Sequence, residues 1–232
     1  MAYVLGVDIG TSGTKTVLFD QNGAVIASAS EEYPLYQPQN GYAEQDPADW
    51  YQATIHTIAK VMKTSGVPKE EVKGIGLSGQ MHGLVMLDDQ YQVIRRSIIW
   101  CDQRTAAECA EITERVGAQR LIEITANPAL TGFTASKILW VRNHEPEHYA
   151  KCRYILLPKD YIRFMLTGEI ATEVSDASGM QLLDIPKRQW SDEVLEKLEI
   201  DKSMLGKVYE SPEITGRVTP KAAELTGLAA GT

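Results

Sequence analysis

The residues best suited to chemistry stand near the start of the chain, in the segment Asp8-Ile-Gly-Thr-Ser-Gly-Thr-Lys15. An apolar run precedes it, so the pattern predicts a buried strand ending in a carboxylate, then a tight loop, then a second strand over Thr16–Phe19. Successive backbone N–H groups in such a loop form a concavity that binds anions. We therefore expect phosphate here, with a plain hairpin turn as the structural alternative. The segment is not a Walker A loop, because the Gly-Lys-Ser/Thr ending is missing.

A histidine between two glycines forms the second candidate, in Gly79-Gln-Met-His-Gly83. Glycines let a backbone or a ligand approach closely, so Gln80 and His82 could hydrogen-bond the hydroxyl groups of a polyol. A lone histidine is more often structural, and the spacing alone leaves that alternative open.

The third candidate is Asp102, within Trp100-Cys-Asp-Gln-Arg104, which joins a predicted apolar strand to a predicted helix. Asp102 could simply cap that helix. Together with Arg104 it could instead hold sugar hydroxyls at the carboxyl end of a strand. The spacing leaves both interpretations open, and the same holds for Asp160 and for the turn Ser175–Gly179.

Two further patterns resemble binding motifs and are rejected. Gly74-Ile-Gly-Leu-Ser-Gly79 matches G-x-G-x-x-G, but a dinucleotide fingerprint needs a strand before it, a helix after it and a downstream acid. The residues that follow resemble a strand, and Ile94 stands where the acid is required. His144 and His148 are spaced for one helical face, yet Pro146 between them disfavours a helical metal site.

The elements that must position these residues are predicted as strands and helices in alternation. Asn22-Gly23 predicts a hairpin turn, because both residues tolerate positive φ. Asp46 and Pro47 predict the start of a helix, and Gly66 its end. Further strands are predicted over 74–77, 83–87 and up to Trp100, and further helices over about 103–116, 134–145, 158–167 and from Ser191. Without an internal repeat or a linker, one α/β unit over 1–232 is expected.

The composition is that of an ordinary globular protein and limits the partners. The chain has 232 residues, 44% of them hydrophobic, and a net charge of -8. No basic stripe is present for a nucleic-acid backbone, which argues against nucleic acid as a partner. No apolar run is long enough to cross a membrane, and Asp8 interrupts the only candidate signal peptide. Three cysteines without a CxxC pair favour reduced thiols and a cytoplasmic location.

Together these segments resemble the FGGY family of carbohydrate kinases and, within it, the xylulokinases. Gly132-Phe-Thr-Ala-Ser-Lys-Ile-Leu-Trp-Val-Arg-Asn-His144 fits the first family signature. Asp8–Lys15 looks like the first phosphate motif, and Gly79–Gly83 looks like the sugar-binding segment. Also in register are Glu44-Gln-Asp-Pro47, Trp100, Asp102, Leu157-Pro-Lys-Asp160 and Ser175-Asp-Ala-Ser-Gly179. The resemblance covers essentially the whole chain.

The resemblance implies the N-terminal lobe of a ribonuclease-H-like α/β fold of the actin and hexokinase type, with a mixed sheet flanked by helices. ATP, Mg²⁺ and an open-chain ketose, D-xylulose, would meet in a cleft between two lobes. Asp8 would hold the metal through water. The loop residues Gly10, Thr11 and Ser12 would cradle phosphate, and Lys15 could neutralise charge on the transferred group. Gln80, Met81 and His82 would contact the ketose, with Asp102 as a further helper.

No residue of the chain is assigned the role of general base. In the family this base is an aspartate in a Gly-Gly-Gly-Asp-like segment, shortly after a stretch resembling Leu228-Ala-Ala-Gly-Thr232. We expect the base beyond Thr232 and negligible activity of the chain alone, because a positioned base contributes about 10²–10⁴-fold in rate. The alternatives are another FGGY kinase of the gluconate, ribulose or glycerol type, a non-catalytic sugar-binding module, and half of a split kinase. Exposed cleft residues could also favour a homodimer.

Overall fold

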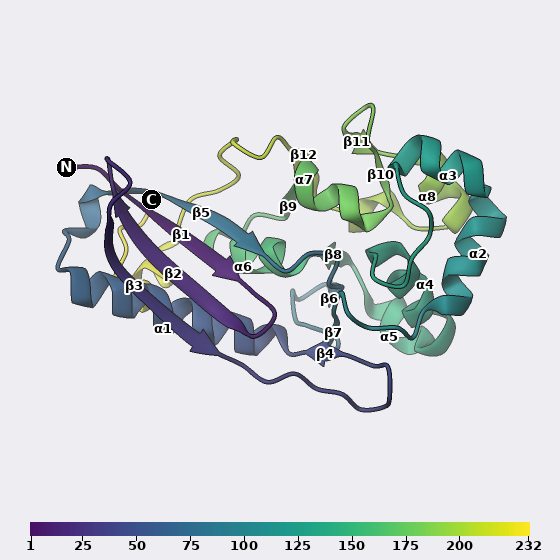
Figure 1. The fold of residues 1–232 in the computed structure, drawn as a ribbon, viewed down its shortest axis with the longest axis horizontal. Helices are drawn as coiled ribbons and strands as arrows, with labels where there is room; N and C mark the ends of the chain where they lie inside the picture. The colour runs from purple at the N-terminus through teal and green to yellow at the C-terminus, as the bar shows by residue number, and fades with distance from the viewer.

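The main sheet holds four strands and carries the N-terminal hairpin at its centre. The computed structural model describes residues 1–232 and orders the sheet β3-β2-β1-β5. Its strands are β1 (Tyr3–Ile9), β2 (Gly13–Asp20), β3 (Val25–Glu32) and β5 (Val72–Gly79). β1 runs antiparallel to β2 and parallel to β5, so the sheet is mixed (Figure 1). The carboxyl ends of the parallel neighbours β1 and β5 therefore lie side by side at the same end of the sheet.

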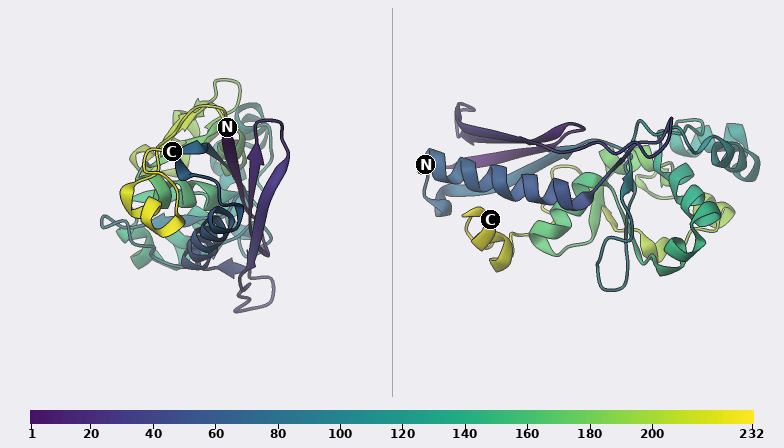
Figure 2. Two further views of the ribbon diagram at one scale, coloured as in Figure 1. Left: turned by 90° about the vertical axis from the view of Figure 1, so that its left-hand side faces the viewer. Right: turned by 90° about the horizontal axis from the view of Figure 1, so that it is seen from below.

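Helix α1 (Pro47–Ser65) covers one face of this sheet (Figure 2). Asp46 accepts a hydrogen bond from the N–H of Ala48, and Gly66 ends the helix at φ 65, as the sequence predicts. Alternate residues of β1, such as Leu5 and Val7, are buried beneath the helix, whereas residues of the opposite set stay at least partly accessible. The alternation thus decides which side chains of the hairpin remain free for a ligand.

The remaining elements are shorter. The other strands are β4 (Glu44–Gln45), β6 (Val85–Leu87), β7 (Ser97–Ile98), β8 (Tyr154–Leu156), β9 (Ala171–Glu173), β10 (Leu183–Asp184), β11 (Gln189–Trp190) and β12 (Lys207–Tyr209). The other helices are α2 (Ala106–Val116), α3 (Ala118–Thr125), α4 (Thr134–His144), α5 (Pro146–Lys151), α6 (Pro158–Thr167), α7 (Val174–Ala177), α8 (Asp192–Leu198) and α9 (Pro220–Thr226). Short 3₁₀ turns lie at Lys69–Glu71, Ser178–Met180 and Lys202–Met204. Most of the helices lie beyond the sheet, at the right in Figure 1.

The apolar interior is divided into two cores by β6, β7 and β8, which we call the partition strands. β6 pairs with β8, and a bridge between Leu84 and Ile98 joins it to β7. Successive residues point to opposite sides. Leu84 and Met86 therefore join the core among α2, α3, α4 and α8, the helical core, while Val85 and Leu87 join the core under the main sheet, the sheet core.

The predicted elements are largely confirmed, with two corrections at the candidate site. The helix over 158–167 and the cap at Ser191 are as predicted, and Gly74–Gly79 lies inside β5 rather than between a strand and a helix. However, β1 continues past Asp8 and β2 begins at Gly13, so the loop is only Gly10–Ser12. Asp102 does not cap α2, which begins at Ala106.

Some elements were not predicted: α3, α5, α7, α9 and several two- or three-residue strands. Among the predicted structural histidines, His144 ends α4 and Pro146 starts α5, so no shared helical face exists. None of the helices is both long and apolar enough to span a bilayer.

Candidate functional site

The β1–β2 hairpin presents a carboxylate and an ammonium group beside a three-residue loop. Asp8 and Lys15 are paired in register across the hairpin, and both are exposed. Ser78 on β5 donates a hydrogen bond to Oδ1 of Asp8 at 2.6 Å. The N–H of Gly10 donates to the carbonyl oxygen of Gly13 at 3.0 Å and closes the turn. Charges of both signs therefore flank one tight turn.

The loop is held by side chains from three other parts of the chain. The indole N–H of Trp100 donates to Oγ1 of Thr11 at 3.0 Å, and Nε2 of Gln45 donates to the carbonyl oxygen of Thr11 at 2.7 Å. The hydroxyl of Tyr33 donates to the carbonyl oxygen of Gly10. The backbone N–H groups of Thr11 and Ser12 donate to no acceptor within the chain. A fixed loop with free donors is the arrangement that binds an anion.

The residues around Asp8 fit a magnesium ion held through water. No group of three or more His, Cys, Asp or Glu side chains gathers to enclose a metal. Mg²⁺ usually keeps several waters and takes one or two carboxylates together with substrate phosphates. An exposed carboxylate beside free phosphate donors supplies that set. The donor chemistry therefore agrees with a metal shared between Asp8 and a bound phosphate.

Gln80 lies beneath the loop and is directed at protein atoms. It is buried, and its backbone N–H donates to the carbonyl oxygen of Ile9 at 2.7 Å. Its Nε2 donates to Oε1 of Gln45 at 2.7 Å, while its Oε1 is buried without a partner. The side chain thus bonds mainly to Gln45, and a direct contact with a sugar stays a prediction. Met81, the next residue, is 47% exposed.

His82 adopts a left-handed backbone conformation that its surroundings stabilise. Its φ is 65°, uncommon for a residue other than glycine. Its carbonyl oxygen accepts hydrogen bonds from Oγ1 of Thr134 at 3.1 Å and from Nζ of Lys137 at 2.9 Å. Its ring packs edge to face against Phe133, with centroids 4.8 Å apart. A Cβ atom on Gly179 would lie 2.2 Å from the ring, so only glycine fits there.

Burial sets the protonation of this segment. Burial and the nearby charge of Lys137 lower the pKa of His82 to about 4, so the imidazole is neutral at physiological pH. Burial likewise lowers the pKa of Lys137 to about 7, although the charge of Asp102 opposes the shift. A neutral imidazole can both donate and accept hydrogen bonds, which suits a hydroxyl partner.

The His82→Asn variant tests this protonation, because asparagine tolerates the left-handed backbone. As the pH falls from 6.5 towards 4, His82 becomes protonated in the unfolded chain but stays neutral in the folded chain. The free energy of unfolding of the wild type therefore decreases. We expect the variant to avoid this loss, by on the order of 1 kcal/mol at pH 5 once solvent screening is allowed for. Urea unfolding at pH 7 and pH 5 measures it. Identical pH dependences would contradict the lowered pKa.

Asp102 is placed where no ligand can touch it. Its side chain has no exposed surface, and its Oδ2 accepts a hydrogen bond from the N–H of Ala43 at 2.6 Å. Arg104 binds both carboxylate oxygens through its side chain and also pairs with Glu44 at 2.9 Å. The predicted direct contact with a sugar is therefore not supported, because every face of the carboxylate is occupied by protein.

A second buried charge cluster lies under the carboxyl end of β5. Lys159 pairs with Glu173 and lies 3.4 Å from Asp176. Burial raises the pKa of Asp176 to about 7, against the attraction of Lys159. Burial opposes charge on Glu173 too, but hydrogen bonds from Lys159 and Ser211 lower its pKa to about 2. Asp160 is buried and pairs with Arg163 at 3.0 Å, so it is structural in this chain.

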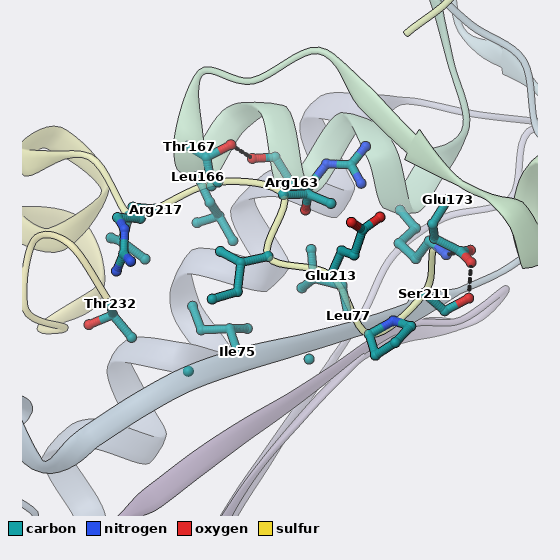
Figure 3. A pocket seen from close by; sticks show the side chains of 18 of the residues that line it. Ile75, Leu77, Arg163, Leu166, Thr167, Glu173, Ser211, Glu213, Arg217 and Thr232 are labelled. Carbon is teal, nitrogen blue, oxygen red and sulfur yellow. Dashed lines mark hydrogen bonds and ion pairs between the residues drawn. The ribbon is translucent and has the colours of Figure 1, made fainter. Parts of the chain in front are cut away.

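One cavity lies away from the loop. It has a volume of about 430 Å³ and runs between β5 and the segment 211–218, with Ile75 and Leu77 along one side (Figure 3). Thr232 lines its end, and Ser211 hydrogen-bonds Glu173 at the other (Figure 3). None of the predicted site residues lines this cavity. The candidate site is therefore the open surface around the hairpin and His82.

Comparison with known proteins identifies the class. The profile "FGGY family of carbohydrate kinases, N-terminal domain" matches residues 3–232, so the chain belongs to this family and corresponds to that domain. A curated relative, "Xylulose kinase" of Bacillus subtilis, is 46% identical over 98% of this chain and 46% of its own length. Another, from Escherichia coli, is 42% identical over 97% of this chain and 46% of its length. The chain spans about half the length of these relatives.

Solved structures agree with this assignment. A xylulose kinase from Rhodospirillum rubrum superposes with a TM-score of 0.94 at 30% identity, covering 99% of this chain and 47% of that one. A gluconate kinase from Lactobacillus acidophilus superposes with a TM-score of 0.93 at 29% identity, covering 100% of this chain and 46% of that one. The predicted ribonuclease-H-like fold, a mixed sheet with flanking helices, is confirmed.

Several residues that build the site were not singled out from the sequence. Trp100, Tyr33 and Gln45 hold the loop, and Lys137 and Gly179 hold His82. Each acts across a long sequence separation, which no local spacing reveals. The resemblance had placed most of them inside family segments without a role.

Proposed function

We propose that the chain is the N-terminal domain, over residues 1–232, of an ATP-dependent sugar kinase that converts D-xylulose to D-xylulose 5-phosphate. The observation that carries this proposal is the adjacency of two half-sites. A loop with free N–H donors ends β1, and the segment Gln80–His82 follows the parallel neighbour β5. Ligands of open α/β sheets bind at the carboxyl ends of such strands. A phosphate and a polyol would therefore meet there.

Each exposed group has a role in this proposal. Asp8 holds Mg²⁺ through water, and the loop Gly10–Ser12 cradles phosphate with the free N–H groups of Thr11 and Ser12. Lys15 offsets charge on the transferred group, since phosphoryl transfer asks mainly for positioning and charge stabilisation. Met81 and His82 contact the ketose. Bound Mg·ATP supplies the phosphoryl group and the cation.

The ketose is proposed from the curated relatives, which carry the name xylulose kinase. The runner-up is a gluconate kinase, because a solved gluconate kinase has a nearly equal TM-score. A sugar-binding module and half of a split kinase are the alternatives of other classes. We propose further that the general base lies beyond Thr232 and that the chain alone turns over xylulose negligibly.

Calorimetric titration of the chain with D-xylulose, D-gluconate and Mg·ATP tests the proposal. We expect D-xylulose to bind and D-gluconate to bind at least ten times more weakly. Asp8→Asn should weaken Mg·ATP and leave D-xylulose binding unchanged, because Asp8 faces the metal. Asp20→Asn, which changes a partly exposed carboxylate at the opposite end of the hairpin, is the matched control. Stronger binding of gluconate would favour the runner-up, and steady turnover by the chain alone would refute the missing base.

Two further proposals concern the oligomeric state and the cellular location. Met81, Trp100 and Leu130 are exposed apolar side chains. We propose that burial of such side chains favours a homodimer, which light scattering can detect. We propose a cytoplasmic location, which the free thiols Cys101, Cys109 and Cys152 support.

A further inference from the structure

Gln45 is a buried side chain that contacts both halves of the candidate site. It forms β4 with Glu44, directly before the cap of α1, and none of its surface is exposed. Its Nε2 lies 2.7 Å from the carbonyl oxygen of Thr11, and its Oε1 lies 2.7 Å from Nε2 of Gln80. The loop and the residue before Met81 are thus joined through one amide group.

The orientation of this amide follows from a tryptophan. The indole N–H of Trp50 can only donate a hydrogen bond, and it lies 3.1 Å from the Gln45 amide. The amide atom that faces it must therefore be the oxygen. The nitrogen is then directed at the carbonyl oxygen of Thr11, which can only accept. Oε1 of Gln45 therefore accepts from Gln80 as well, so Nε2 of Gln80 must be the donor. We call this chain of hydrogen bonds from Gln80 through Gln45 to Thr11 the relay, and each of its bonds has only one possible donor.

The relay fixes the loop from a side that a ligand cannot reach. Trp100 holds Oγ1 of Thr11, whereas Gln45 holds its carbonyl oxygen, so Thr11 is restrained through both its side chain and its backbone. Restraint of the carbonyl leaves the N–H groups of Thr11 and Ser12 free for an anion. Gln80 transmits the same restraint to Met81 and His82 through its backbone.

We infer that Gln45 is a positioning residue that sets the loop Gly10–Ser12 and the segment Gln80–His82 in fixed register. The inference rests on the proposed function for its consequence, the joint placement of phosphate and ketose. Its structural part, the fixed position of the two segments, depends only on the buried hydrogen bonds. A displacement of about 1 Å between reacting groups costs on the order of 10²-fold in rate, so such a residue matters without touching a ligand.

The test uses the whole chain and three variants. Gln45→Met fills a similar volume and removes both contacts. Gln80→Leu removes the contact between the two glutamines and a longer one, 3.4 Å, from Gln80 to the carbonyl oxygen of Gly10, and it leaves the bond from Gln45 to Thr11. Gln52→Met is the matched control, because Gln52 is exposed on α1 and forms no side-chain hydrogen bond. Nuclear magnetic resonance relaxation reports backbone order in each.

We expect Gln45→Met to lower the order parameters of Thr11, Ser12 and His82 from about 0.85 to below about 0.6. Gln80→Leu should lower only that of His82, and Gln52→Met should change neither segment. A folded Gln45→Met chain with the order of the control would overturn the inference. If that variant does not fold, an unchanged His82 in Gln80→Leu overturns it.

A ligand titration separates this inference from the proposed function. Gln45→Met should weaken D-xylulose binding about tenfold, although Gln45 cannot reach a ligand. If the unmodified chain binds no D-xylulose, the proposed function fails, and the relaxation result alone decides the role of Gln45. If the unmodified chain binds and the variant binds equally well, the positioning role fails while the function stands.

Discussion

Replacing Asp102 with asparagine lowers the free energy of unfolding by about 3 kcal/mol, the scale of a broken buried ion pair. The carboxylate is fully buried and accepts hydrogen bonds from Ala43 and Arg104. An asparagine amide would turn an N–H₂ donor towards one of these donors. It would also leave the guanidinium of Arg104 with Glu44 as its only carboxylate partner. Both effects follow from the direction of the hydrogen bonds rather than from a change in volume.

Urea unfolding of the chain at pH 7 measures this loss. Asp192→Asn is the control, because the Asp192 side chain is 81% exposed and its pair with Lys202 lies at the surface. Surface pairs contribute about 0–1 kcal/mol, so the control should lose less than 1 kcal/mol. An Asp102→Asn chain that matches the control would mean that the buried cluster stabilises the fold far less than its geometry indicates.

Replacing Gly179 with alanine displaces the ring of His82. The new Cβ would lie 2.2 Å from a ring carbon, and Phe133 packs against that ring, so it cannot simply withdraw. Overpacking of this kind costs about 1–3 kcal/mol. Because the ring moves towards solvent, we expect the pKa of His82 to rise from about 4 towards its ordinary 6.5. Magnetic resonance titration of the imidazole and urea unfolding check both results.

A double-mutant cycle identifies the contact as the cause. His82→Gly accepts the left-handed backbone and removes the ring, so the clash should vanish in the double variant with Gly179→Ala. We expect an interaction energy of at least about 1 kcal/mol in favour of the double variant. Gly74→Ala serves as the control, since nothing lies within 4 Å of its Cβ position. Strictly additive single changes would exclude the clash.

Local signals in the sequence predicted the helices that are bounded by clear capping residues. Asp46 and Gly66 bracket α1, and Ser191 caps α8, because capping is decided within a few residues. The N-terminal loop was predicted too long. Glycine and threonine favour turns locally, yet pairing with β1 extends β2 back to Thr14 and pairing with β3 extends it back to Gly13.

The candidate site was predicted in part for the same reason. The exposed groups of the hairpin could be found, because Asp8, Lys15 and the hydroxyl residues form one continuous segment. Asp102 could not be interpreted correctly, since its burial depends on Arg104 and on a backbone N–H far away in sequence. The pairing of Gln45 with Gln80 spans a separation of 35 residues, and no local pattern encodes it.

The partition strands bear on how this chain loses its structure. A chain with two interiors could melt in two steps, with one half denatured while the other persists. Here the segment Leu84–Leu87 and β8 contribute alternate side chains to both interiors, so melting of the helical core would expose Leu84 and Met86 on the same segment that still buries Val85 and Leu87. A half-unfolded species would expose the apolar side chains on one side of these strands to water. It would gain little conformational entropy, because the strands themselves would stay ordered. We therefore expect the two interiors to unfold together in a single all-or-none transition.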